Sequence, residues 1–139
     1  YMENYYGVME GELDNPPEET PGWHASEFET SMDLAWNEDL VRMDRATFTK
    51  TSIPDWLPES FQKEDGLPDV EFEGYRYFTF PMEHHDFTET GVIGNPKRAT
   101  VEKGETGFRK YSEHVARGVL ELEKQEVEIH NREFTDRAM

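Results

Sequence analysis

The chain has 139 residues, the length of one ordinary domain, and 31 acidic against 14 basic side chains give it a formal net charge of −17. This surplus excludes a nucleic-acid binder, because too few cations are present to neutralise a row of phosphates, and it opposes docking on an anionic membrane. No apolar run approaches the roughly 20 residues of a membrane span, and the lack of cysteine excludes disulfides and a thiolate nucleophile. We therefore expect an acidic, cytoplasmic protein.

The composition predicts a chain that does not close a complete hydrophobic core by itself. Apolar residues make up only 35% of the sequence, while aromatic residues reach 13%, which is too many for a disordered acidic tail. The sequence opens on Tyr1 rather than on methionine. We therefore expect a processed or partial chain that belongs to a larger assembly.

The first third of the chain predicts a strand, a loop and a helix. Residues 1–9 are rich in aromatic and β-favouring side chains and predict a short strand. Residues 10–22 are acidic and contain three prolines, which is typical of a loop. Apolar side chains recur at helical spacing over residues 25–36, so we expect a helix there, and residues 40–43 lead into the next strand.

The middle of the chain predicts two strands separated by a long irregular segment. Residues 47–53 carry β-branched side chains and end before Pro54, as a strand does. Residues 54–72 contain three prolines among scattered charges, which favours an excursion without firm structure. The aromatic-rich residues 75–80 form the strongest predicted strand of the chain.

The last third predicts a polar loop, a turn and a long helix. Residues 83–86, Glu-His-His-Asp, form the predicted loop, and residues 91–96 hold two apolar side chains between glycines, which is turn chemistry. Apolar side chains at steps of three and four predict an amphipathic helix over residues 101–129, with Thr100 as its N-cap.

Two stretches of the sequence resemble the creatininase (creatinine amidohydrolase) family. Residues 24–31 read His-Ala-Ser-Glu-Phe-Glu-Thr-Ser, and they are similar to the family's His-Ala-Gly-Glu-x-Glu-Thr-Ser block. Residues 91–96 read Gly-Val-Ile-Gly-Asn-Pro, and they are similar to the turn that leads into the family's last helix. The order and separation of the two blocks fit the family.

The resemblance implies a fold and a class of reaction. Family members are metal-dependent hydrolases of cyclic or linear amides with an α/β fold. The resemblance covers the family's C-terminal half, so we expect residues 1–139 to form a single domain portion of a three-layer α/β/α sandwich with a mostly parallel sheet. Residues 54–72 are then an insertion or excursion in that portion.

The resemblance also implies where a metal would be held. The Glu-x-His-Gly and Asn-Gly-His motifs that supply most of the family's ligands do not occur in this sequence. We therefore expect a divalent metal (Zn, Mn or Fe) bound mainly by a second chain that carries the N-terminal half, and no metal ligand in this chain. The family's closed oligomers imply a higher oligomer of the paired unit.

The resemblance assigns catalytic roles to His24 and Glu29. His24 matches the family's active-site histidine, and an imidazole that titrates near neutrality can pass a proton from a water to a leaving nitrogen. Glu29 lies five residues later, about 140° round a helix, so the two share a face only if His24 precedes the helix. Glu29 would then orient His24, hold a water or support a ligand of the partner. Glu27 is expected to be a solvated helix residue.

Two aromatic residues and one departure from the family motif complete the candidate site. Trp23 can wall a substrate pocket by stacking on a planar amide, with core packing as an equally good alternative. His84 is placed at the mouth of the substrate site, although residues 83–86 are more typical of a solvated loop. Ser26 replaces the family's glycine, and a serine would be strained if that position requires a positive φ.

Three functions remain open from the sequence. The first is the C-terminal portion of an amidohydrolase that cleaves a C–N bond in a small amide, lactam or formamide. The second is a non-catalytic structural or regulatory subunit that kept the fold. The third is an acidic module that binds a basic partner, which explains the charge but neither motif block.

Overall fold

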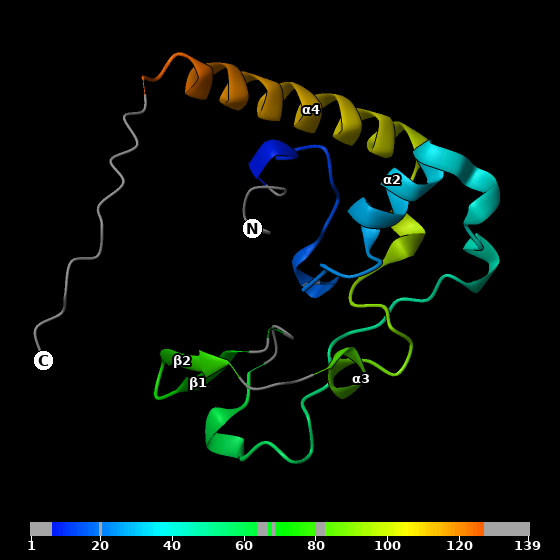
Figure 1. Cartoon of the computed structure of the whole chain (residues 1–139). Helices are drawn as coiled ribbons and strands as arrows, with labels where there is room; N and C mark the ends of the chain where they lie inside the picture. Colours follow the sequence, from blue (N-terminus) through cyan, green and yellow to red (C-terminus); the bar gives the residue numbers. More distant parts are fainter. Residues whose placement is uncertain (1–6, 20, 64–66, 68, 80–82, 127–139) are drawn as a thin grey trace, which may run out of the picture.

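The computed structural model describes residues 7–19, 21–63, 67, 69–79 and 83–126. Its longer elements are the helices α2 (Glu27–Asn37) and α4 (Val101–Glu123), with the strands β1 (Asp69–Phe72) and β2 (Tyr75–Thr79) and the short helix α3 (His84–Phe87) (Figure 1). Single turns of 3₁₀ helix lie at Pro17–Glu19, Glu38–Leu40, Met43–Arg45, Glu59–Phe61 and Pro96–Arg98.

Helices α2 and α4 form the main packed pair of the molecule. In Figure 1, α4 crosses the top of the structure and α2 lies directly beneath its first half. A Cβ on Gly104 would overlap the backbone carbonyl of Ser31, and a Cβ on Gly107 would approach the ring of Phe28 to 2.5 Å. The two glycines, one turn apart, therefore let the helix backbones meet at close range.

Both helices begin close to the predicted positions. The Thr100 hydroxyl accepts the N–H of Lys103 over 3.2 Å at the start of α4, as its predicted N-cap role requires. The Thr100 N–H donates to the hydroxyl of Ser31, which is fully buried on α2, over 3.1 Å. The predicted helix over residues 25–36 is confirmed as Glu27–Asn37. The predicted helix over 101–129 is confirmed up to Glu123, and residues 127–129 lie outside the described part of the chain.

The described residues form one small sheet, which differs from the expected architecture. Strands β1 and β2 pair antiparallel around a turn in which Glu73 and Gly74 have φ of +51° and +81°. Within the described ranges no parallel pair of strands is present, so the mixed helix-and-strand character holds while the three-layer sandwich is not formed by these residues. The strand predicted over residues 75–80 is confirmed over Tyr75–Thr79 as β2, and residue 80 lies outside the described part of the chain.

Several other local predictions were wrong. The strand predicted over residues 1–9 is a helical turn at residues 7–8, and residues 1–6 lie outside the described part. The strand predicted over residues 47–53 is reduced to one bridge between Thr49 and Gly94, because no extended partner runs beside it. The 54–72 excursion contains one 3₁₀ turn and all of β1, and the loop predicted over residues 83–86 is largely α3.

The hydrophobic core is small for the length of the chain. Among the described residues the buried apolar side chains are Met9, Phe28, Leu34, Leu57, Val70, Phe87, Ile93 and Ala99. Most of them lie around α2 and the turn before α4, so this region fixes the positions of the two motif blocks. None of the described helices is both long and apolar enough to span a membrane.

Candidate active site

The two motif blocks meet at His24. The N–H of Ile93 donates to the His24 carbonyl over 2.8 Å, and the N–H groups of Trp23 and His24 donate to the Ile93 carbonyl over 3.0 and 3.3 Å. On the other side of the same segment, Thr49 and Gly94 exchange hydrogen bonds of 3.1 and 2.9 Å. The turn of the second block therefore fixes the backbone of the histidine in the first block.

The backbone around Ser26 explains why position 94 of the second block is a glycine. Gly94 has φ +122°, and a Cβ there would overlap the side chain of Ser26. The positive φ in the first block falls on Ala25, at +47°, whereas Ser26 has φ −89°. Ser26 is therefore unstrained in the place of the family's glycine, and its small side chain packs against Gly94 instead.

Glu29 lies beside His24 because His24 precedes the helix. The Glu29 carboxylate accepts the N–H of Ala25 over 2.7 Å, which holds the side chain back over the start of α2. Its Oε2 then lies 3.9 Å from Nδ1 of His24. The two side chains are 41% and 54% exposed, so both remain accessible from outside the chain. The structure thus meets the geometric condition that the sequence set for this pair.

His84 and Trp23 complete a cluster of rings around His24. The imidazoles of His24 and His84 stack with their centroids 4.2 Å apart and their planes inclined by 26°. The Trp23 ring lies 6.0 Å from His24 and 5.6 Å from His84. The four residues that the sequence selected therefore lie together, although they come from the loop before α2, from α2 itself and from α3.

The position of His84 depends on a short helix, and on a contact with Trp56, that were not predicted from the sequence. A capping box between Glu83 and Asp86 starts α3, and the Glu83 N–H donates to the Asp86 carboxylate over 2.8 Å. This hydrogen bond lowers the pKa of Asp86. The indole N–H of Trp56 donates to the same carboxylate over 3.4 Å. Glu83 directly before His84 and Asp86 two residues after it were the available signal for this short helix.

Glu27 is not the solvated residue that was expected. Its side chain is 4% exposed and forms an ion pair of 2.7 Å with Lys103 of α4. Its two carboxylate oxygens also accept the N–H groups of Asp14 and Asn15, over 2.8 and 2.9 Å. Burial alone would lower the pKa of Lys103, but hydrogen bonds to Glu27 and Asp14 raise it. Glu27 of the first block and Lys103 of α4 therefore join the two helices.

A second ion pair anchors the acidic loop before the site. Arg98 donates to Glu19 with Nε and Nη2, over 2.5 and 2.9 Å, and Asn95 donates to the same carboxylate over 2.8 Å. The hydrogen bonds from Arg98 hold the pKa of Glu19 below its ordinary value, and a hydrogen bond from Lys103 does the same for Asp14. This network ties residues 14–19 to the turn that precedes α4.

The depressed pKa of Glu19 predicts how stability depends on pH. A carboxyl group whose pKa is lower in the folded state stabilises the protein above its unfolded pKa, and this contribution is lost as the pH falls through the folded pKa. We expect the urea midpoint to decline below about pH 5, and to decline less steeply in Glu19→Gln. Glu18→Gln, at an exposed position of the same loop, serves as the control. Equal slopes for the parent and Glu19→Gln would contradict the assignment.

The described residues do not complete a metal site. No group of three or more His, Asp or Glu side chains in this part of the chain has the geometry to hold a metal ion. His24 and His84 present stacked faces to each other, whereas two imidazoles that share an ion must point nitrogens at it. A metal at this site would need ligands from other residues.

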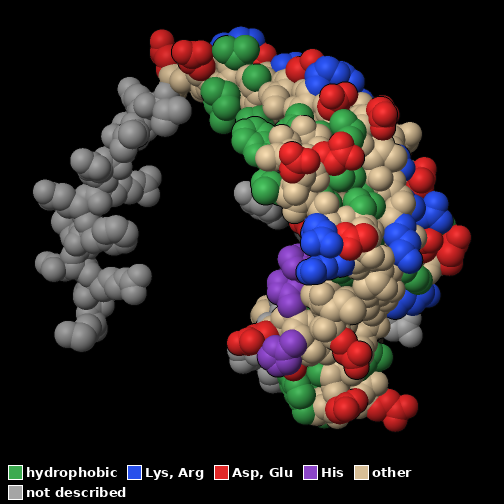
Figure 2. Space-filling view, turned by 90° about the vertical axis from the view of Figure 1, so that its right-hand side faces the viewer, with side chains coloured by type: hydrophobic (Ala, Val, Ile, Leu, Met, Phe, Trp, Pro, Cys, Tyr) green, Lys and Arg blue, Asp and Glu red, His purple; other side chains and the backbone are tan. Residues whose placement is uncertain are grey.

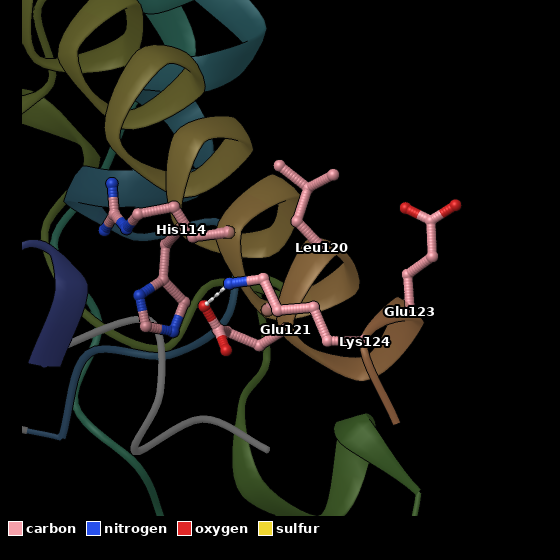
Figure 3. Close-up of a pocket in the computed structure, with 7 residues that line it drawn as sticks. His114, Leu120, Glu121, Glu123 and Lys124 are labelled. Atoms are coloured by element: carbon pink, nitrogen blue, oxygen red, sulfur yellow. Dashed lines mark hydrogen bonds and ion pairs between the residues drawn. The ribbon is translucent and has the colours of Figure 1, made fainter. Parts of the chain in front are cut away.

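A wide depression lies elsewhere, along the second half of α4 (Figure 3). Its volume is about 740 Å³, and its lining residues within the described chain are His114, Arg117, Gly118, Leu120, Glu121, Glu123 and Lys124. All of them come from α4 and the residue that follows it, and Lys124 pairs with Glu121 across the depression. A surface built on one helix, without convergent groups from a second element, is a poor candidate for chemistry.

The chain belongs to the creatininase family, whose sequence model, described as creatinine amidohydrolase, matches residues 4–119. This match contains both motif blocks and all four residues of the ring and carboxylate cluster. Comparison with curated proteins gives no match.

Solved creatininase structures share the fold. One described as "Creatininase Mn" is 24% identical with a TM-score of 0.52, over 87% of this chain and 42% of that chain. A mutant creatininase of the Zn-Zn type and a mutant creatininase complexed with creatine are each 24% identical with a TM-score of 0.53, over the same shares of the two chains. The present chain therefore spans less than half the length of the creatininases that it matches.

Proposed function

We propose that this chain is the C-terminal portion of a metal-dependent amidohydrolase, in which His24 moves the proton during cleavage of a C–N bond. One observation carries the proposal: an accessible imidazole lies at the junction of the two family blocks, between a carboxylate and two aromatic rings. The substrate class is a small amide, lactam or formamide. Family membership supports the hydrolase class, and the cluster supports the role of this chain in it.

His24 suits proton transfer by its chemistry and by its neighbours. A histidine changes charge near neutral pH, so it can accept a proton from water and deliver it to a leaving nitrogen. The Glu29 carboxylate, 3.9 Å from Nδ1, favours the tautomer with its proton on Nδ1. Nε2 is then the acceptor. Glu29 acts by charge and position, because 3.9 Å is too long for a direct hydrogen bond.

Trp23 and His84 are proposed to hold the substrate. A planar amide or lactam stacks on aromatic faces, and both rings lie within 6.0 Å of the His24 imidazole. Together with the His24 ring, they are proposed to form the side of the site that this chain supplies. The rest of the pocket wall is assigned to the other half of the fold.

The metal ligands are proposed to lie mainly on a second chain that carries the N-terminal half of the fold. The residues described here do not form a metal site, and the chain spans 42% of the "Creatininase Mn" chain. A bound divalent ion (Zn, Mn or Fe) would supply a Lewis acid for the amide carbonyl and for water. The second chain would also complete the three-layer sandwich with its mostly parallel sheet. The paired unit is proposed to form a higher oligomer in the cytoplasm.

Metal removal from the assembled protein tests the proposal. Creatinine, linear amides and formamides are the first substrates to assay, with release of the new amine or carboxylate as the readout. We expect turnover to fall by at least about 100-fold after dialysis against a chelator, since the metal activates both carbonyl and water, and to return with Mn²⁺ or Zn²⁺. If the protein has demonstrably lost its metal and its turnover is unchanged, the proposal of a metal-dependent hydrolase is overturned.

A non-catalytic subunit of the same fold is the second candidate. The contacts of the motif residues within the chain favour this candidate. Glu27 and Ser31 hold α2 against α4, and Glu29 accepts the N–H of Ala25. In this alternative the motif residues contribute to packing and have no catalytic role. It predicts that removal of the His24 imidazole leaves turnover of the assembly unchanged.

A further inference from the structure

Helix α3 carries His84 but is too short to hold its own shape. It spans four residues, His84–Phe87, and an isolated turn of helix is unstable because its formation fixes several dihedral angles for one hydrogen bond. The position of the His84 ring against His24 therefore depends on contacts from outside the helix. These contacts differ between its two ends.

The C-terminal end of α3 is fixed by burial and by backbone contacts. Phe87 is 6% exposed, and its carbonyl accepts the N–H of Ser52 over 2.7 Å. Thr88, which follows the helix, is 3% exposed, and its hydroxyl donates to the carbonyl of Val92 over 2.7 Å. This end is thus joined to the second motif block, which includes Val92.

The N-terminal end, where His84 lies, is exposed and is held through Asp86. The Asp86 carboxylate accepts the N–H of Glu83 on Oδ2 over 2.8 Å and the indole N–H of Trp56 on Oδ1 over 3.4 Å. His84 and Glu83 are exposed, whereas the Asp86 side chain is only 20% exposed. One partly buried carboxylate therefore links the first turn of α3 to a residue thirty positions earlier in the chain.

The ring arrangement at the candidate active site depends on the orientation of α3. The His84 ring lies 4.2 Å from His24 and 5.6 Å from Trp23, so a small rotation of the helix would separate it from both. Figure 2 shows histidine side chains on the inner edge of a crescent, with acidic side chains beside the lower group. A residue that fixes the rotation of α3 therefore controls the rings on which a planar substrate would stack.

We propose that Asp86 is a positioning residue, which holds His84 against His24 in the arrangement that binds the substrate. This inference rests on the proposed function, because it takes the ring cluster as the substrate-binding surface. Asp86 acts through the helical turn that carries His84, and Trp56 is its second hydrogen-bond donor. Its removal is therefore expected to weaken substrate binding and to leave proton transfer by His24 in place.

Removal of a carboxylate at two nearby positions tests the proposal by kinetics. In the assembled protein, Asp86→Ala is expected to raise KM about 10-fold, as loss of hydrogen bonds to a charged group does, and to change kcat less than about 3-fold. Glu89→Ala is the matched control at an exposed position two residues after α3, and it is expected to leave both constants within about 2-fold of the parent. Equal effects of the two variants, or a loss in kcat with KM unchanged, would overturn the proposal.

Two further variants separate positioning from folding. Asp86→Asn keeps one acceptor oxygen and so retains at most one of the two hydrogen bonds, and its KM is expected to lie between those of the parent and Asp86→Ala. Trp56→Phe removes the indole donor and is expected to raise KM in the parent but not in Asp86→Ala, where the acceptor is absent. Additive effects of the two substitutions would contradict the proposal. If Asp86→Ala does not assemble, Asp86→Asn against Glu89→Gln makes the same comparison, with the same expected direction.

The distance between the two imidazoles gives a readout that does not depend on turnover. In crystal structures of the assembled protein, the His24 and His84 centroids are expected to move from 4.2 Å apart to beyond about 7 Å in Asp86→Ala, the limit of an aromatic contact. Rings that stay stacked in the variant would overturn the proposal. If the rings separate in an assembly that hydrolyses no amide, the positioning role stands and the proposed function fails. Chelator-sensitive turnover with an unchanged KM in Asp86→Ala would do the reverse.

Discussion

Replacement of His24 by alanine is expected to lower turnover of the assembled enzyme by about 10²–10⁴-fold, the range for a general acid–base residue. The imidazole lies 3.9 Å from the Glu29 carboxylate and stacks on His84, which is proposed to hold the substrate rather than to move the proton. Because the reaction loses proton transfer rather than substrate contacts, we expect the loss chiefly in kcat and little change in KM. Steady-state kinetics on the best amide substrate measures both constants.

His114→Ala is the matched control for this experiment. His114 is exposed on α4, outside the ring and carboxylate cluster. We expect its removal to leave kcat within about 2-fold of the parent, since it contacts none of the reacting groups. If His24→Ala behaves like His114→Ala in an intact assembly, the catalytic role is wrong and the non-catalytic subunit becomes the better account.

Gly104→Ala is expected to produce the largest loss of stability. A Cβ at this position would overlap the backbone carbonyl of Ser31 and approach the Cβ of Ala35 to 2.7 Å. Backbone cannot move aside as a side chain does, so α2 and α4 must separate, at a cost of about 3 kcal/mol, the upper range for overpacking. Urea unfolding followed by circular dichroism measures the change in the free energy of unfolding.

Gly118→Ala separates the packing effect from helix propensity. Gly118 lies on the same helix with no atom within 4 Å of a Cβ built there. Alanine should stabilise α4 at this position by about 0.5–1 kcal/mol, because it restricts the unfolded chain and favours the helix. Gly104→Ala and Gly118→Ala are therefore expected to have opposite signs. A stabilising Gly104→Ala would show that the helices do not pack through this glycine.

The candidate site was predictable because its chemistry is concentrated in motifs. His24 and Glu29 lie within one block of eight residues, and Trp23 lies directly before it. The helical spacing already required that His24 precede the helix if it was to share a face with Glu29. His84 lies sixty residues further on, and its approach to His24 depends on a capping box and on Trp56. Such contacts depend on tertiary structure, which local spacing does not encode.

The fold was predictable where local signals were strong. The two long helices and β2 follow from apolar periodicity, from Thr100 as a cap and from a dense run of aromatic residues. The strand expected over residues 47–53 failed because a strand requires a partner, and Thr49 meets Gly94 alone. Glu27 was misplaced for a similar reason: a helix residue looks solvated until the opposite helix supplies Lys103.

Chemical rescue of His24→Ala tests the central claim most directly. Free imidazole can enter the space left by the side chain and move the proton in its place, provided that proton transfer is what His24 supplies. We predict that turnover of His24→Ala by the metal-loaded assembly rises with imidazole concentration and follows the imidazole base as pH changes, while the parent does not respond. A variant that turns over at the parent rate without imidazole would contradict the account.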